Sequence, residues 1–176
     1  MKRKTTRRKV PAKRAAAKKK KKVQPIPAGY HAITPYLAVR GGAQAIEFYK
    51  KAFGAKEIMR MPGPDGKLGH AEISIGGSRI MLSDEYEPMS FFGPQTRGGT
   101  TVLIHLYVKD VDATVARAVA AGGKLVRPLQ DQFYGDRTGS IEDPFGHMWY
   151  VATHTRDLSM AEIKLGAAEA AKQEGG

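Results

Sequence analysis

Two halves of the chain share one pattern, and this internal repeat constrains the fold more than any other feature. In the first half, a strand-like segment at residues 34–40 leads into an amphipathic helical segment that Gly54 ends. The same plan returns 69 residues later, with a strand-like segment at residues 103–109 and a helical segment that Gly122 and Gly123 end. The matched pairs are Leu37 with Leu106, Val39 with Val108 and Arg40 with Lys109.

The segments after each helix also match. In the first half, strand-like stretches at residues 56–61, 68–75 and 78–84 are separated by Gly and Pro. In the second half the corresponding stretches are residues 124–127, 137–142 and 147–154. Each half is therefore predicted to be a βαβββ module. The alternative is chance similarity between two ordinary α+β halves.

The two helices carry separate signals. Spacing of i, i+3, i+6 and i+7 puts four apolar side chains on one face of the first helix: Ile46, Tyr49, Ala52 and Phe53. Asp110 is a suitable N-cap for the second helix. Its apolar stripe consists of Val111, Val115, Ala118 and Val119. Both stripes favour helices that each cover one face of a sheet.

A single βαβββ module leaves the other sheet face bare. We therefore expect an α+β fold in which two βαβββ modules form a cupped mixed sheet with helices outside and a cavity inside. The predicted domain spans residues 29–157, with modules at about 30–87 and 100–157 and a Pro/Gly-rich connection at residues 87–99. Residues 158–176 are expected to form a weak C-terminal helix or a tail.

The basic charge is confined to one end of the chain. Residues 1–22 hold 13 of the 29 Lys and Arg residues and no acid, so the remainder carries 16 bases against 17 acids. Residues 1–28 are predicted to be a disordered polybasic tail followed by a Pro linker, because they hold little apolar surface to bury. The cations would bind nucleic-acid phosphates without sequence preference. The alternatives are a solvated tail without a role and a mitochondrial transit peptide.

Composition excludes several classes of protein. The chain has no cysteine, which excludes disulfides, thiolate metal sites and cysteine nucleophiles. No apolar run reaches the ~20 residues needed to span a bilayer, and no apolar stretch follows the basic N-terminus as in a secretory signal. We therefore expect no membrane partner and take the cytoplasm as the default compartment.

Two motifs resemble a known family. Residues 45–54 (AIEFYKKAFG) resemble the FY-x-x-x-FG helix of the vicinal-oxygen-chelate superfamily, which has the glyoxalase/bleomycin-resistance/extradiol dioxygenase fold. Residues 142–147 (EDPFGH) resemble the turn before its last strand. Residues 130–137 (QDQFYGDR) and 149–154 (WYVATH) are similar to the PhnB-like branch. The resemblance covers about residues 29–157, implies this fold and a homodimer, and leaves the reaction open because the superfamily includes enzymes and non-catalytic drug-binding proteins.

The resemblance also implies where a metal would sit. Enzymes of the superfamily hold a divalent ion with His, Gln or Glu from the first and last strand of each module. The matching positions here hold Thr34, Met81, Leu103 and Tyr150. None of these is a competent ligand, so we expect no cofactor and no metal of the usual kind. The alternative is a divalent metal held by an atypical set made of His70, Glu72 and His105.

Strand alternation predicts which side chains face the cup. On the first strand, Thr34 and Tyr36 should face it, whereas Ile33, Leu37 and Val39 should face the helix. The predicted ligand-binding residues are Thr34, Tyr36, Met81, Ser83, Leu103, His105, Tyr107, Arg137 and Tyr150. This lining suits a partly aromatic ligand with hydrogen-bonding groups.

Two of these residues have competing interpretations. His105 is the best candidate for acid/base catalysis, because apolar residues flank it and it faces the cup. A structural histidine is the alternative. Arg137 could anchor an anionic ligand group, or form a salt bridge with an acid such as Asp136 or Glu142. His147, in the turn motif, is expected to be structural, and His31 is expected to lie on the surface.

Three functions follow from these observations. The favoured hypothesis is a protein that binds a small organic molecule in the cup without the usual family metal. The first alternative is a metal-dependent lyase or dioxygenase with an atypical ligand set. The second is a nucleic-acid-associated accessory protein that acts through residues 1–22.

Overall fold

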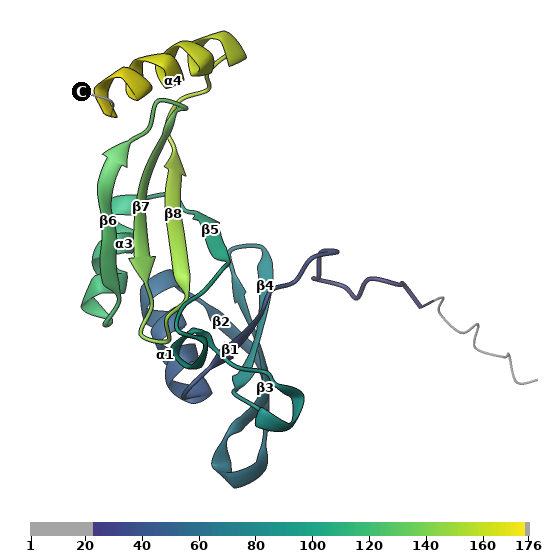
Figure 1. The fold of residues 1–176 in the computed structure, drawn as a ribbon. Coiled ribbons are helices and arrows are strands. Elements are labelled where there is room, and N and C mark those ends of the chain that lie inside the picture. Colours follow the sequence, from purple (N-terminus) through teal and green to yellow (C-terminus); the bar gives the residue numbers. More distant parts are fainter. Residues whose placement is uncertain (1–22, 175–176) are drawn as a thin grey trace, which may run out of the picture.

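The repeat in the sequence is a repeat in the structure (Figure 1). The computed structural model describes residues 23–174, so the predicted basic tail at residues 1–22 lies outside the described part of the chain. The first module comprises β1 (Tyr36–Val39), α1 (Gly42–Phe53), β2 (Lys56–Pro62), β3 (Leu68–Ile75) and β4 (Ser78–Asp84). The second comprises β5 (Leu103–Tyr107), α3 (Val111–Ala120), β6 (Lys124–Asp131), β7 (Asp136–Glu142) and β8 (Met148–His154).

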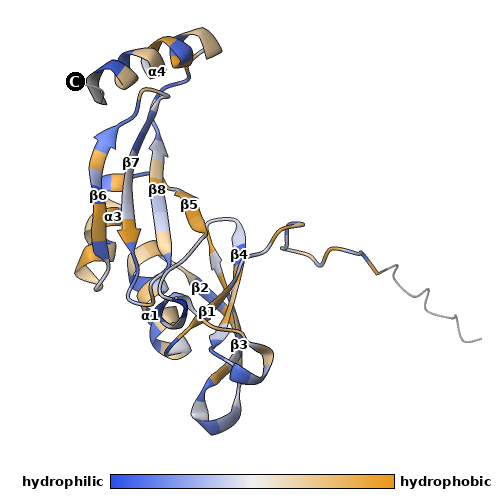
Figure 2. Cartoon of the chain, in the orientation of Figure 1, coloured by the Kyte–Doolittle hydropathy of each residue, from blue (hydrophilic) through white to orange (hydrophobic). Residues whose placement is uncertain are grey.

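Shorter elements connect the modules and follow them. The 3-10 turn η1 (Pro64–Gly66) joins β2 to β3, and η2 (Glu87–Met89) and α2 (Pro94–Arg97) lie in the connection between the modules. A last helix, α4 (Met160–Glu174), follows β8. Figure 1 shows α4 lying across the end of the second module that is farther from the first. None of the helices described is long and apolar enough to cross a membrane, and Figure 2 shows hydrophilic residues interspersed along α4.

The sheets have the same topology. Their strand orders are β1-β4-β3-β2 and β5-β8-β7-β6. In each sheet the first strand of the module pairs in parallel with the last, and the other neighbours are antiparallel. Tyr36 pairs with Met81, and its counterpart His105 pairs with Tyr150. The predicted fold class, two βαβββ modules in an α+β domain, is confirmed.

The structure adds one difference from the expected single cup. Within residues 23–174 the strands form two separate four-stranded sheets. The helices α1 and α3 pack against each other as well as against their own sheets. One face of each sheet therefore lies against helices, and the opposite face, called the bare face below, carries the exposed side chains of β1 and β5.

The core lies on the helix side and continues from one module to the other. Phe53, at the end of α1, packs on Trp149 of β8 with ring centroids 4.6 Å apart. Tyr49 lies beside the same indole at 5.5 Å. All three side chains are buried. Aromatic burial thus joins the first helix to the last strand of the other module, and the domain has one core.

Local sequence explains how α1 begins. Gly41 precedes the helix with φ +92°, a conformation that favours glycine. A Cβ on Gly42 would lie 2.5 Å from a methyl carbon of Leu68, so only glycine fits there. The first strand is shorter than predicted and starts at Tyr36. Ile33 is therefore not held against the helix as predicted, and it is exposed.

Candidate functional site

The predicted ligand-binding residues other than Arg137 are distributed over both bare faces. Tyr36, Leu103 and Tyr107 are 40%, 50% and 60% exposed, respectively. His105 is also exposed, and Thr34, Met81 and Tyr150 are half-buried. Ser83 is buried, and its hydroxyl donates to the carbonyl oxygen of Asp84. These side chains are spread across two open surfaces that both begin at the inner edge strands β1 and β5.

A pocket lies between those edge strands. It has a volume of about 780 Å³ and is lined from both modules. Tyr36 on β1 and Leu103 and His105 on β5 contribute to it, together with Phe92 and Arg97 from the connection. The Arg97 guanidinium carbon lies 4.9 Å from the centre of the Phe92 ring. This volume and the mixture of aromatic, apolar and few polar groups are typical of small-molecule sites.

A second pocket adjoins the first on the bare face of the first module. Its volume is about 700 Å³, and Tyr36 and Phe91 line both pockets. The ring of Tyr36 stacks on His70 at 5.5 Å and meets Phe91 edge-on at 5.2 Å. Ser83 and Met61 also line this pocket. An aromatic partition thus separates two neighbouring cavities.

The bare face of the second module holds a hydrogen-bonded cluster. The hydroxyl of Tyr150 lies 2.8 Å from that of Thr138 and 2.9 Å from that of Tyr134. Burial, together with the hydrogen bond to Tyr150, raises the pKa of Tyr134 well above its usual range. Gln132 donates to Thr138 at 2.9 Å. The ring of His105 meets that of Tyr150 edge-on at 5.2 Å, so the best catalytic candidate borders this cluster.

A buried carboxylate lies beside that cluster. Asp136 is 3% exposed. It accepts a hydrogen bond from the Tyr107 hydroxyl at 2.8 Å and pairs with His154 Nδ1 at 2.7 Å. Burial alone would raise the pKa of Asp136, but the hydrogen bonds from His154 and Tyr107 outweigh burial and lower it. The bonds to Asp136 and Asp157 raise the pKa of His154. The second bare face can therefore present phenol and imidazole groups against a fixed negative charge.

Arg137 points away from this face. Its guanidinium forms two bonds of 2.8 Å with Asp112 of α3, and a third contact of 3.4 Å with Asp131. Alternation along β7 places Asp136 on the bare face and Arg137 on the helix side. The geometry therefore supports the salt-bridge interpretation over the anion anchor, with partners other than the Asp136 and Glu142 named from the sequence.

The positions of the family's metal ligands do not form a metal site here. Thr34, Met81 and Leu103 offer no ligand for a divalent ion, and the hydroxyl of Tyr150 is engaged by Thr138 and Tyr134. Of the atypical set, His70 and Glu72 do lie together, with Nε2 and Oε1 3.5 Å apart. Among residues 23–174, however, no three His, Cys, Asp or Glu side chains are placed to hold a metal ion. The donor chemistry does not fit the family metal.

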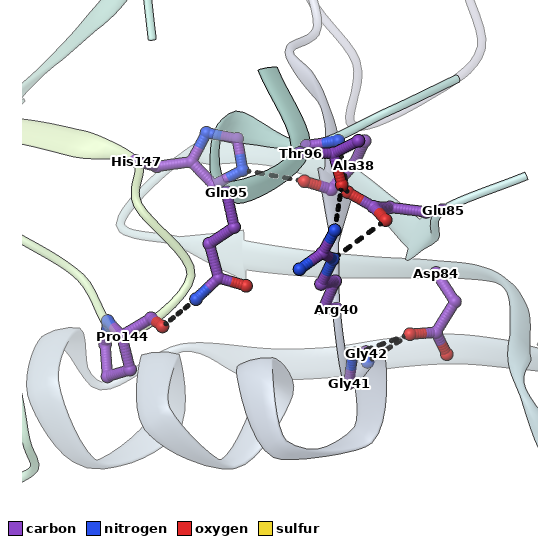
Figure 3. Close-up of polar contacts among 11 residues, drawn as sticks. Ala38, Arg40, Gly41, Gly42, Asp84, Glu85, Gln95, Thr96, Pro144 and His147 are labelled. Atoms are coloured by element: carbon purple, nitrogen blue, oxygen red, sulfur yellow. Dashed lines mark hydrogen bonds and ion pairs between the residues drawn. The ribbon is translucent and has the colours of Figure 1, made fainter. Parts of the chain in front are cut away.

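Polar contacts hold the modules in place around the site (Figure 3). The Nε2 atom of His147 donates to the carbonyl oxygen of Ala38 on β1 at 3.0 Å, because a carbonyl can only accept. Glu85, directly after β4, accepts from Arg40 at 3.1 Å and from Thr96 of α2. His147 is buried and structural, as predicted. The connection over the pocket is thereby fixed to β1.

Several residues of the site were missed from the sequence. Asp143, in the turn motif at residues 142–147, supports the site from the core: its carboxylate accepts from the Tyr49 hydroxyl at 2.8 Å and from the Trp149 indole at 2.9 Å. Asp136 was considered only as a possible salt-bridge partner of Arg137, and neither Asp136 nor Tyr134 of the motif at residues 130–137 was among the predicted ligand-binding residues. The concentration of polar residues in that motif was the sequence signal that could have identified them.

Comparison with known proteins identifies the family. The model of the Glyoxalase/Bleomycin resistance protein/Dioxygenase superfamily matches residues 30–151. The chain belongs to this superfamily. The resemblance inferred from the FY-x-x-x-FG helix and the turn motif is therefore confirmed. The match covers both modules, including the two edge strands that line the first pocket.

Relatives occur among bacteria. The Mycobacterium tuberculosis protein Rv0887c is 48% identical over 136 residues, which cover 76% of this chain and 80% of that protein. TioX from Micromonospora sp. ML1 is similar in structure, with 30% identity, a TM-score of 0.57, and coverage of 69% of this chain and 97% of TioX. The PhnB protein from Bacillus cereus shares the fold at 19% identity, with a TM-score of 0.56 and coverage of 70% and 99%.

Proposed function

We propose that this member of the superfamily binds a small organic molecule in the pocket between β1 and β5, without the usual family metal. The observation that carries the proposal is the lining of that pocket. It combines aromatic and apolar side chains with His105 and Arg97, while the family's metal-ligand positions hold no suitable donors. Such a lining suits a partly aromatic ligand with an acidic or hydrogen-bonding group.

A second copy of the chain is part of this proposal. The bare faces expose Tyr36 on β1 and Leu103 and Tyr107 on β5, and exposed apolar patches mark protein–protein contact surfaces. A homodimer that covers these faces would enclose the ligand site. Sedimentation equilibrium at micromolar concentration should give the mass of two chains, and a monomer at tens of micromolar would contradict the dimer.

The ligand proposal is tested with an aromatic anion, 8-anilinonaphthalene-1-sulfonate. We expect saturable fluorescence enhancement, unchanged by EDTA and lost in Leu103→Asp. Leu165→Asp is the matched control, because Leu165 lies on α4 away from the pocket and is 63% exposed. Equal binding by both variants would place the probe outside this pocket, and binding that EDTA abolishes would favour a metal-dependent enzyme.

A second candidate function rests on the charge of residues 1–22. Their 13 cations would engage nucleic-acid phosphates whatever the domain binds. The domain itself is close to neutral, so this activity would belong to the tail alone. The cytoplasm stays the predicted compartment for either function.

A further inference from the structure

One aromatic side chain from the segment before β1 packs onto the bare face of the first module. Residues 23–29 and 31–33 are exposed, whereas Tyr30 is half-buried. The Tyr30 hydroxyl donates a hydrogen bond to the carboxylate of Glu72 on β3. Its ring centre lies 5.4 Å from the guanidinium carbon of Arg79 on β4. Tyr30 thus anchors residues 23–33 on the sheet, and Gly29 lies against the Arg79 side chain beside it.

The residues that receive Tyr30 form a polar row across the sheet. Glu72 is only 9% exposed, and Oε1 lies 3.5 Å from His70 Nε2. The other ring nitrogen of His70 lies 2.9 Å from the Tyr36 hydroxyl. A buried carboxylate requires hydrogen-bond donors. The hydroxyl of Tyr30 supplies one of these donors to the Glu72 carboxylate.

One hydrogen-bond donor of Arg79, at the end of this row, has no acceptor among residues 23–174. Nη1 of Arg79 is buried and has no hydrogen-bond partner within the described part of the chain. It lies 4.0 Å from Glu72 Oε2. Buried polar groups in purely structural networks are nearly always paired. The cluster therefore has unused capacity to bind another group.

Tyr30 itself is held by few contacts. Its backbone N–H donates to the carbonyl oxygen of Pro27 at 3.1 Å, within a turn of the same exposed segment. The hydrogen bond to Glu72, and to a lesser extent burial, raises the pKa of Tyr30, so the phenol keeps its proton and remains a donor at neutral pH. The side chain can leave the sheet without opening the core, which lies on the other face.

We propose that Glu72, Arg79 and His70 form a subsite for the hydroxyl-bearing aromatic ring of a small molecule, and that Tyr30 occupies it as an intramolecular substitute. The carboxylate of Glu72 accepts the ligand's hydroxyl hydrogen, and the guanidinium of Arg79 stacks on its ring. The subsite is independent of the function proposed above, because Glu72, Arg79 and Tyr30 do not line the pocket between β1 and β5.

The test uses p-cresol, which has the same ring and hydroxyl as a tyrosine side chain. In the full-length chain, Tyr30→Ala should bind p-cresol at least about tenfold more tightly than the wild type, because no internal phenol competes. Toluene, which lacks the hydroxyl, should bind both proteins equally weakly. His31→Ala is the control for a change in the same exposed segment and should bind like the wild type.

Two further variants assign the contacts. In Tyr30→Ala with Glu72→Gln, the gain in p-cresol affinity should be lost. In Tyr30→Phe, which keeps the ring, affinity should fall between those of the wild type and Tyr30→Ala. NMR spectra of each variant establish that the fold is retained, and shifts of the Glu72 and Arg79 amides locate the ligand. Equal p-cresol affinity in wild type and Tyr30→Ala, or equal binding of toluene and p-cresol by Tyr30→Ala, would overturn the proposal.

Discussion

At the scale of single residues, Phe53 packs against the core of the second module as well as that of its own. It ends α1 and packs in a tilted geometry against Trp149, which belongs to the last strand of the other module. Both side chains are buried. Phe53→Ala should lower the free energy of unfolding by about 3–5 kcal/mol, because it leaves a cavity between the modules. Urea denaturation followed by tryptophan fluorescence measures the change.

Leu165→Ala provides the control for that substitution. Leu165 is exposed on α4, so its truncation should change stability by less than about 0.5 kcal/mol. A similar loss in both variants would show that α4 contributes as much as the core. A negligible loss for Phe53→Ala would contradict the packing between the modules.

The ion pair between Asp136 and His154 should make the stability of the fold depend on pH. Hydrogen bonds to Asp136 and then Asp157 raise the pKa of His154. Charged His154 therefore stabilises the fold fully at pH values below about 6.5, the pKa of a histidine in the unfolded chain. This stabilisation is lost as pH rises through the higher pKa that His154 has in the folded protein. Asp136, whose pKa is lowered against the effect of burial, contributes fully above the unfolded aspartate pKa of about 3.9 and loses this contribution as pH falls through its lower folded pKa.

The measurement is stability against pH in the wild type and in His154→Gln. The wild-type advantage should be present at pH 6 and should decline as pH rises above about 6.5. His31→Gln, which changes an exposed histidine outside this pair, should follow the wild type. An advantage that grows with rising pH would show that the charged pair does not stabilise the fold.

At the scale of elements, α1 begins on an unusual cap. The carboxylate of Asp84, at the end of β4, accepts from the backbone N–H groups of Gly41 at 2.7 Å and Gly42 at 2.9 Å. Its other oxygen accepts from Leu68 at 2.6 Å. Asp84→Ala should cost about 2–4 kcal/mol, because three charge-assisted bonds are lost and water replaces them only in part. Thermal or urea unfolding measures the cost.

Asp110 supplies the matched comparison. It caps α3 from the preceding position in sequence and accepts one bond of 2.9 Å from Ala113. Asp110→Ala should cost only about 1 kcal/mol. The loss in Asp84→Ala should therefore be larger than the loss in Asp110→Ala. Equal losses of stability would mean that Asp84 stabilises the fold no more than an N-cap from the adjacent residue does.

The different origins of these caps explain what could be predicted from the sequence. Asp110, the helix stop at Gly54 and the strands Leu68–Ile75 and Ser78–Asp84 depend on local signals, and they were predicted. The cap from Asp84 was missed, because its partners lie more than 15 residues away in the chain. Helix–helix packing between the modules also depends on tertiary contacts, and it was not foreseen in the expected single cup.

The candidate site was predictable in part for the same reason. Alternation along β5 predicted that Leu103, His105 and Tyr107 share the face turned to the cup; they do share one face, and it is exposed. Alternation could not show that the two bare faces belong to separate sheets, or that Arg137 is engaged by Asp112 on α3. The second pocket depends on Phe91 in the connection, where no periodic pattern applies.

At the scale of the whole molecule, the strongest charge lies outside the domain. If about six to ten of the cations in residues 1–22 contact phosphates, affinity for duplex DNA should fall by about 10³–10⁵ between 50 and 200 mM salt. A chain that starts at Val23 should lose DNA binding and keep the same melting temperature. Retained binding would place the site on the domain, and no binding by the full-length chain at low salt would contradict a role for the tail in nucleic-acid binding.

The central claim is that this domain binds its ligand without the metal of its superfamily. Elemental analysis of the full-length protein, purified without chelators, tests it most directly. Because Thr34, Met81, Leu103 and Tyr150 stand at the ligand positions, we predict far less than one Zn, Ni, Mn or Fe ion per chain. Occupancy near one ion per chain that is lost in His70→Ala or His105→Ala would contradict the claim and establish an atypical metal site.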